Sequence, residues 1–118
     1  MKRGSHRSAT AAGQHAEQIA AAHLALLGMQ VLARNVRGAG GEIDIVAREG
    51  DTIVFVEVKA RSSAAFGSAL AAVDARKRRR IRAIAADYLQ VVAPQSRARF
   101  DVLTIEPAGI TLHRNAFA

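Results

Sequence analysis

Hydrophobic residues recur at every second position through the middle of the chain, and this period predicts β-strands rather than helices. Residues 41–59, GEIDIVAREGDTIVFVEVK, read as two such strands separated by Gly50-Asp51. With Gly50 in the positive-φ position of a type II′ turn, Glu49 faces Thr52 and the register of the whole hairpin follows. The pattern therefore predicts which side chains of the two strands share a face.

Counting back along this hairpin brings charged residues together on one face of the predicted sheet. Asp44 falls opposite Glu57, and Glu42 falls opposite Lys59. The other face is apolar and carries Ile43, Ile45, Val54, Val56 and Val58. Facing carboxylates have Cβ atoms about 5 Å apart and repel each other, so a divalent cation such as Mg²⁺ would stabilise them. The alternative is that Glu42 pairs with Lys59 while the other two acids line a solvated face.

Longer amphipathic segments on both sides of the hairpin predict helices at 10–27 and 74–92. Shorter alternating segments predict a first strand at 30–36, a further strand at 97–105 and an edge strand at 110–113. The resulting order is helix, three strands, helix, then one or two strands. We therefore expect an α/β fold in which helices flank a mixed β-sheet, because a long helix between two strands suits a crossover connection.

Of the acids outside the hairpin, Glu17 and Asp101 have predicted roles. Glu17 precedes Ala20 by three positions and Leu24 by seven, so a helix places it on the apolar side of the first helical segment. The alternative is that Glu17 lies at the edge of this apolar stripe and is solvated. Asp101 lies in the strand at 97–105, where we expect a structural ion pair with an arginine of the second helix.

Composition narrows the function classes that fit these elements. The 118 residues suffice for one domain, expected from residue 10 to 118, after a basic and disordered arm at 1–9. There is no cysteine, so any metal must be held by carboxylates. Lys and Arg number 17 against 10 Asp and Glu, and the net charge of +7 favours nucleic acid as the partner. An anionic membrane surface would leave the acidic cluster unexplained. No apolar run reaches transmembrane length, so we expect a cytoplasmic protein.

The basic residues are concentrated at the start of the second predicted helix. We expect phosphate contacts from its six basic side chains: Arg76, Lys77, Arg78, Arg79, Arg80 and Arg82. Lys77 lies on the apolar side of this helix and should point toward the sheet. Outside the helix the candidates are Arg37 and Arg61, with Arg34 and Asn35 in the first strand. The alternative for all of these residues is an ordinary solvent-facing position.

Several short motifs resemble the signature of the PD-(D/E)xK nuclease superfamily, which has the restriction-endonuclease-like fold. They are Gly41-Glu42-Ile43-Asp44, then Phe55-Val56-Glu57-Val58-Lys59-Ala60-Arg61, Gly67, and Arg99-Phe100-Asp101-Val102. In this order they are similar, more narrowly, to the YraN family of predicted endonucleases, which is related to the archaeal Holliday-junction resolvases. The resemblance extends from about Gly13 to Ile105 and implies an αβββαβ core.

The resemblance also implies roles for the site residues. Asp44, Glu57 and the Val58 carbonyl would hold Mg²⁺, with Mn²⁺ as a possible substitute. Glu17 matches a glutamate of the first helix that contributes to the metal site in that family. Lys59 would orient the attacking water or stabilise the charge that builds on the phosphate.

Together these features lead us to expect a metal-dependent endonuclease that hydrolyses DNA phosphodiester bonds in repair or recombination. It would select branched or junction structure rather than sequence, because phosphate contacts carry no base information. A homodimer would suit a cutter of junctions. The alternative is a non-catalytic nucleic-acid-binding or recombination-accessory module with the same fold. An RNA-directed protein is disfavoured, since aromatic residues for stacking on unpaired bases make up only 4% of the chain.

Overall fold

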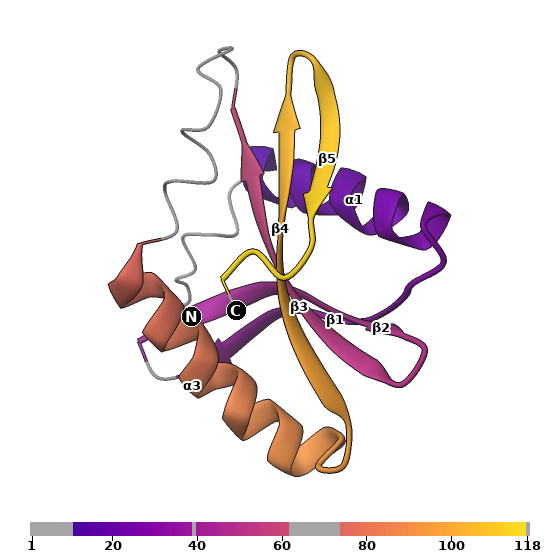
Figure 1. The fold of residues 1–118 in the computed structure, drawn as a ribbon. Coiled ribbons are helices and arrows are strands. Elements are labelled where there is room, and N and C mark those ends of the chain that lie inside the picture. The colour runs from indigo at the N-terminus through magenta and orange to yellow at the C-terminus, as the bar shows by residue number, and fades with distance from the viewer. Residues whose placement is uncertain (1–10, 39, 62–73, 118) are drawn as a thin grey trace.

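The computed structural model describes residues 11–38, 40–61 and 74–117 (Figure 1). Its elements are α1 (Ala11–Leu26), β1 (Gln30–Gly38), β2 (Gly41–Glu49), β3 (Thr52–Ala60), α3 (Ala75–Val92), β4 (Arg97–Glu106) and β5 (Gly109–His113). The strands form one sheet in the order β1-β2-β3-β4-β5, in which β3 and β4 are parallel and the other neighbours antiparallel. This is the predicted α/β fold with its αβββαβ core, and β5 extends the sheet edge. The arm expected at 1–9 lies outside the described residues.

Local sequence signals delimit both helices. The chain turns after α1 at Gly28, whose φ is +93°, and the Met29 N–H donates to the Leu24 carbonyl at 3.0 Å. Asp74 caps α3, because its Oδ1 accepts a hydrogen bond from the Lys77 N–H at 2.9 Å. Neither of these two described helices combines the length and hydropathy needed to span a membrane.

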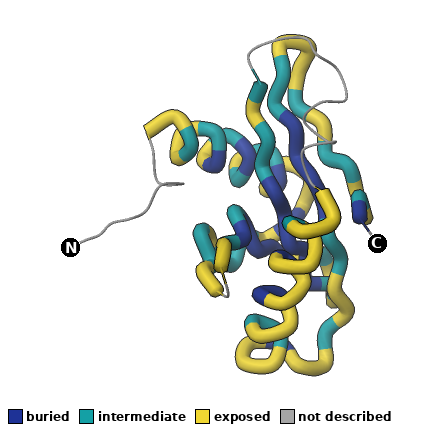
Figure 2. Tube along the Cα trace, turned by 90° about the vertical axis from the view of Figure 1, so that its left-hand side faces the viewer, coloured by how far each residue is buried: buried dark blue, intermediate teal, exposed yellow. Residues whose placement is uncertain are grey.

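The two helices of the described residues pack against separate apolar clusters of the sheet, and Figure 2 shows the buried residues along the strands between them. The cluster under α1 contains Ala20, Leu24, Met29, Ile45, Ala47, Val54, Val56 and Leu103. The cluster under α3 contains Ile43, Val46, Ile53, Phe55, Ile81, Ile84, Ala85 and Val102. Because both helices are fixed in this way, the polar side chains that they turn inward have defined positions next to the strands.

The predicted register of the β2–β3 hairpin is confirmed near its turn. Glu49 pairs with Thr52, and the ladder continues to the pair of Ile45 and Val56. Gly50 has a φ of +61°, as the first central residue of a type II′ turn requires. The period-2 pattern and the turn residues were therefore sufficient to align this part of the sheet.

Past this point β2 and β3 diverge, and the predicted pairing of Glu42 with Lys59 is wrong. Along these diverging ends β2 stays paired only with β1, and β3 only with β4, and both of these pairings continue along the rest of each strand. Asp44 reaches across the opening, where its Oδ2 accepts a hydrogen bond from the Val58 N–H at 2.8 Å. The divergence leaves space for polar side chains between two strands that are otherwise apolar.

The predicted alternation of β2 also fails at its start. Ile43 belongs to the cluster under α3, whereas the period-2 pattern places it with Ile45 on the other face. The neighbouring strand explains this slip, because Asn35 has a φ of +53° between the pairs Arg34–Ile45 and Val36–Ile43. A left-handed residue interrupts the pleat, so the alternation shifts by one position. The acids beside Ile43 consequently point toward α1.

Candidate metal centre

Acidic and basic side chains meet where β2 and β3 diverge. A cavity of about 530 Å³ lies there between α1, the two strands and the start of α3. Its lining includes Glu17, Glu42, Asp44, Glu57, Val58, Lys59 and Lys77. The structure therefore brings together every residue that the sequence predicted for catalysis or metal binding, although they come from three separate segments of the chain.

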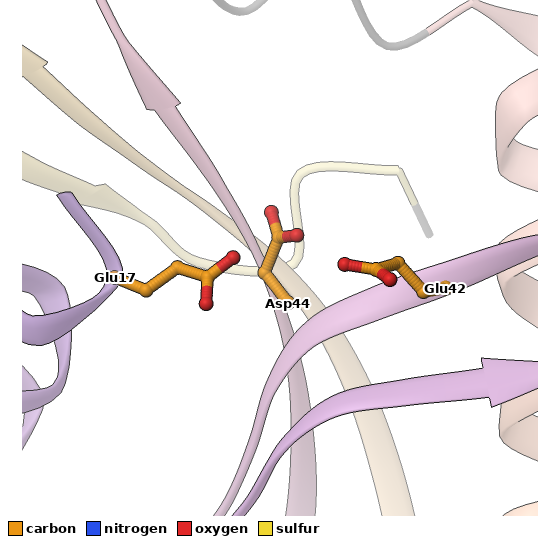
Figure 3. A group of neighbouring side chains, drawn as sticks. All are labelled: Glu17, Glu42 and Asp44. Carbon is orange, nitrogen blue, oxygen red and sulfur yellow. The ribbon is translucent and has the colours of Figure 1, made fainter. Parts of the chain in front are cut away.

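Three carboxylates from α1 and β2 gather on one side of this cavity (Figure 3). One oxygen from each of Glu17, Glu42 and Asp44 lies within 4.8 Å of the others. Glu17 is only 4% exposed, because Ala20 and Leu24 on the same side of α1 are fully buried. The solvated alternative for Glu17 is therefore wrong. Oxygen donors at this spacing suit a hard cation.

Glu57 has the least satisfied carboxylate of the cavity. Its side chain is buried, with 3% of the residue exposed. Oε2 lies 3.0 Å from the Lys77 Nζ, but Oε1 has no hydrogen-bond partner among the described residues. A buried charged oxygen without a partner is unfavourable. This atom is therefore available to a ligand that enters the cavity.

The charge of Asp44 is also difficult to accommodate. Burial and, to a lesser extent, the negative charge of Glu57 raise the pKa of Asp44 to about 8, and Glu17 adds to the shift. The Val58 N–H and the charge of Lys77 oppose it. At neutral pH Asp44 therefore favours its protonated form, and a bound cation would reverse that preference.

Two lysines face the same carboxylates and differ in their tendency to lose a proton. Burial lowers the pKa of Lys59 to about 8, and the neighbouring Lys77 adds to this effect, while Glu57 and Asp44 oppose it. Burial also lowers the pKa of Lys77, but interactions with Glu57 and Lys59 outweigh burial and raise it. Lys59 is thus able to exchange a proton near neutral pH, whereas Lys77 remains charged beside Glu57.

Some of the predicted phosphate-binding residues lie near the cavity. Arg80 lines a second cavity of about 270 Å³, which adjoins the first because Glu42 and Lys77 line both. The Arg37 Nε lies 3.7 Å from Oε1 of Glu42. Arg61 follows directly after β3 and is half-buried. Of these basic side chains, Lys77 and Arg80 line the cavities, and Arg37 contacts an acid of their lining.

The other basic residues of α3 point elsewhere. Arg78 and Arg82 lie over the Phe117 ring, with guanidinium carbons 5.8 and 5.9 Å from its centroid. Arg82 also donates a hydrogen bond to the Phe117 carbonyl. Arg76 and Arg79 are exposed. The helix therefore distributes its arginines around its circumference, as its periodicity requires.

Asn35 is a member of the site that sequence reasoning did not identify. Its expected role was a phosphate contact or a solvent-facing position. Its Nδ2 instead donates to both carboxylate oxygens of Glu17, at 3.0 and 3.1 Å, and to Oε2 of Glu42 at 3.1 Å. Only the residue type could have indicated an unusual position in the strand, because asparagine adopts positive φ more readily than most non-glycine residues.

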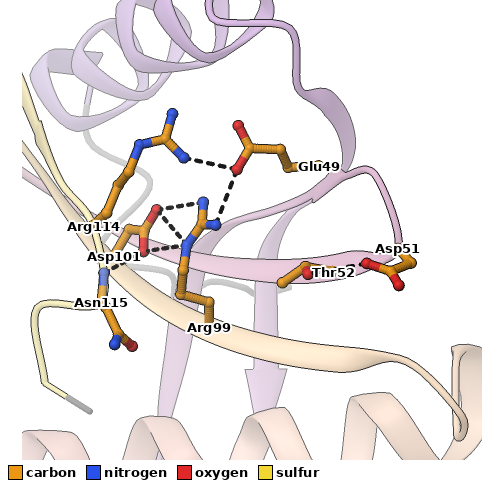
Figure 4. Close-up of polar contacts among 7 residues, drawn as sticks. All are labelled: Glu49, Asp51, Thr52, Arg99, Asp101, Arg114 and Asn115. Carbon is orange, nitrogen blue, oxygen red and sulfur yellow. Dashed lines mark hydrogen bonds and ion pairs between the residues drawn. The ribbon is translucent and has the colours of Figure 1, made fainter.

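Asp101 forms a structural ion pair, but its partner is not an arginine of the second helix. The Arg99 Nε donates to Oδ1 of Asp101 at 3.0 Å, and the Asn115 N–H donates to the same oxygen at 2.8 Å (Figure 4). Arg99 also lies 2.9 Å from Glu49, which accepts from Arg114 at 2.7 Å. Residues two apart on a strand share a face, so Arg99 is the nearest arginine to Asp101.

The fold and the position of the carboxylates define a class of protein. The αβββαβ order, the mixed sheet between two helices and the acids at the divergence of its central strands are those of a restriction-endonuclease-like α/β protein. This is the class that the sequence resemblance implied.

The chain belongs to the uncharacterised protein family UPF0102, which is the YraN family, and the model of that family matches residues 16–105. A UPF0102 protein of Cupriavidus pinatubonensis is 45% identical over 115 residues, which cover 96% of this chain and 91% of the relative. One from Parafrankia is 51% identical over 94 residues, covering 79% and 80%. One from Dechloromonas aromatica is 43% identical over 109 residues, covering 92% and 90%. These names state a family and no activity.

Proposed function

We propose that this protein is a metal-dependent endonuclease that hydrolyses DNA phosphodiester bonds. The unpartnered Oε1 of buried Glu57 carries the proposal, because the same cavity holds oxygens of Asp44 and Glu17. A divalent cation would satisfy this oxygen and remove the repulsion that contributes to the raised pKa of Asp44. Since all of these donors are oxygen, the site suits Mg²⁺ or Mn²⁺ better than a softer metal.

The residues that would hold the cation come from both sides of the divergence. Asp44, Glu57 and the Val58 carbonyl would hold it from β2 and β3, and Glu17 and Glu42 would complete the oxygen donors. The bound ion would supply Lewis-acid polarisation of the phosphate and a more acidic water. The protein contributes a preformed cavity, lined by Glu57, in which the carboxylates of Glu17, Glu42 and Asp44 are already close together.

Lys59 is the proposed partner of the attacking water. Its Nζ would orient that water, or would donate a hydrogen bond to the phosphate oxygen on which negative charge builds. A pKa of about 8 allows either protonation state near neutral pH. Lys77 has a different role, because it holds Oε2 of Glu57 and leaves Oε1 to the cavity.

The distribution of positive charge supports DNA as the substrate. The chain carries a net charge of +7 although four acids surround one cavity. Lys77 and Arg80 line the second cavity, where a neighbouring phosphate of the same strand would lie. Because these contacts would address phosphates rather than bases, we propose that the enzyme selects branched structure rather than sequence.

A non-catalytic nucleic-acid-binding module remains the second candidate. The contact that favours it is the ion pair of Lys77 with Glu57, at 3.0 Å, which satisfies half of the critical carboxylate without a metal. Such a module would use the same basic surface and would bind DNA without cutting it. The two candidates therefore differ in metal-dependent cleavage and agree in DNA binding.

The deciding experiment is nicking of labelled duplex, flap, four-way-junction and single-stranded DNA in Mg²⁺, Mn²⁺ or EDTA. The wild type is compared with Glu57→Ala and Lys59→Ala, and with Asp87→Asn, an exposed change of charge on α3, as the matched control. We expect metal-dependent cutting by the wild type and the control, with a preference for branched DNA. Neither site variant should cut, although both should bind.

Binding of DNA by all four proteins without any cutting would favour the accessory module. Cutting that persists equally in both site variants would indicate a contaminating nuclease and would contradict the proposed site. The salt dependence of binding separates none of these outcomes, because every phosphate-binding protein shows it.

A further inference from the structure

Asn35 has an unusual backbone conformation for a residue inside a strand. Its φ of +53° lies in the left-handed region, and among the described residues only one other non-glycine residue, Asn115, has a positive φ. Such a conformation is unfavourable for an L-residue and persists where the surrounding contacts favour it. We therefore expect the contacts of the Asn35 side chain to favour this conformation.

The side chain of Asn35 joins two carboxylates from different elements. Its Nδ2 donates to Oε1 and Oε2 of Glu17 in α1, at 3.0 and 3.1 Å, and to Oε2 of Glu42 in β2, at 3.1 Å. Carboxylates only accept hydrogen bonds when ionised, so the NH₂ group of the amide must face them. The amide thus holds together two acids that would otherwise repel each other.

The other donors to these acids are longer and more exposed. The Arg34 Nη2 lies 3.5 Å from Oε1 of Glu17, and its side chain is 37% exposed. The Arg37 Nε lies 3.7 Å from Glu42, and its side chain is 52% exposed. The half-buried Asn35 is therefore the closest donor to both carboxylates, and solvent competes with it least.

We propose that Asn35 is a positioning residue that sets the affinity of the metal centre. This inference rests on the proposed function, since it requires a cation at the cavity. Each carboxylate has two oxygens, so Glu17 and Glu42 can keep a hydrogen bond to the amide while offering electron pairs to a cation. Hydrogen bonds to metal-binding carboxylates fix their orientation, and loss of such partners typically weakens metal binding by roughly 10–100-fold.

Asn35→Gly separates the amide from the backbone conformation. Glycine adopts the same positive φ without strain, so the variant loses only the side chain. Asn115→Gly is the matched control, because Asn115 has a φ of +54° but contacts its carboxylate, Asp101, through its backbone N–H rather than through its side chain. Mn²⁺ binding to each purified protein is measured by electron paramagnetic resonance and calorimetry, without DNA.

We expect Asn35→Gly to weaken Mn²⁺ binding by roughly 10–100-fold, and Asn115→Gly to change it less than about twofold. Equal binding by Asn35→Gly and the wild type would overturn the role of Asn35 while leaving the metal centre intact. A wild type that binds no Mn²⁺ would overturn both this inference and the proposed function.

Asn35→Asp provides a second test if the glycine variant does not fold. Aspartate has a similar size and also adopts positive φ, but its ionised carboxylate cannot donate to Glu17 and Glu42. If the hydrogen bonds set the affinity, this variant binds Mn²⁺ more weakly than the wild type. If only the total charge matters, its additional negative charge makes binding tighter, and that result would overturn the inference.

Discussion

The sheet buries carboxylates in two places and satisfies them differently. Asp101 is fully buried, yet Arg99 and the Asn115 N–H supply it with donors, and Arg99 also connects it to Glu49. Glu57 is almost as buried, but one of its oxygens has no partner among the described residues. The first arrangement is complete without a ligand and the second is not. Burial of an acid alone therefore does not identify a functional site. A buried carboxylate oxygen without a hydrogen-bond partner does.

Among the substitutions that test this difference, Glu57→Gln should have the largest effect on activity. Glutamine keeps the shape and an acceptor for Lys77, but it removes the charge that a cation requires. We expect metal-dependent nicking to fall at least about 100-fold, while the free energy of unfolding in EDTA changes by less than about 1 kcal/mol. Nicking assays and denaturant titration check the two expectations. Unfolding of this variant would assign Glu57 a structural role like that of Asp101.

Asp101→Asn should lower the stability of the fold and leave metal binding unchanged. The change removes one of the two carboxylates that pair with Arg99 and leaves Glu49 as its ionic partner, in a largely buried position where 19% of the Arg99 side chain is exposed. We expect a loss of about 2–4 kcal/mol in the free energy of unfolding, measured by urea denaturation. The fraction that remains folded should bind Mn²⁺ with wild-type affinity. A specific loss of Mn²⁺ affinity would mean that the two regions are coupled.

Asp44→Asn should stabilise the metal-free protein as the pH rises. The pKa of Asp44 is about 8 in the folded state and 3.8 for an unperturbed aspartate, so the folded state retains a proton that the unfolded state releases between these values. Wild-type stability therefore falls as the pH rises from about 4 to 8, whereas the variant lacks this loss. In EDTA at pH 8–9 we expect a gain on the order of 2 kcal/mol, measured by thermal unfolding. Parallel pH profiles for the two proteins would refute the raised pKa.

Arg114→Ala should have the smallest effect. Arg114 lies 2.7 Å from Glu49, but its side chain is 45% exposed and Arg99 also supports Glu49. We expect a loss of about 0.5 kcal/mol at neutral pH. The hydrogen bond from Arg114 lowers the pKa of Glu49 below the 4.5 of an unperturbed glutamate, so this loss should disappear as the pH falls through the folded-state pKa. A loss that is independent of pH would indicate packing instead.

The sequence predicted the elements and the hairpin register because these depend on local signals. The period of two, Gly50 and the residues opposite the turn determine how β2 meets β3. The same signals place Asp44, Glu57 and Lys59 near one another, and the resemblance adds Glu17. The proximity of these residues was therefore predictable before any coordinates.

The remaining features of the site depend on contacts between distant segments. The left-handed Asn35 shifts the alternation of two strands, so Ile43 and Glu42 change direction although their own sequence gives no sign of it. The partner of Asp101 is a different case, because Arg99 lies two positions before it on the same strand and a period of two would have indicated it. Strand periodicity describes an undisturbed pleat and cannot report where a neighbour interrupts it.

The early end of the β2–β3 ladder affects the order in which the chain can fold. A hairpin with a two-residue turn closes within about 1–10 microseconds, so the segment from Ile45 to Val56 is able to form first. The end of β2 that carries Asp44 can pair early with β1, which directly precedes it in the sequence. The end of β3 that carries Glu57 gains its neighbour only when β4 joins from a more distant part of the sequence. The like charges thus remain hydrated while the hairpin forms. Their burial is deferred until the apolar clusters under α1 and α3 assemble and offset its cost.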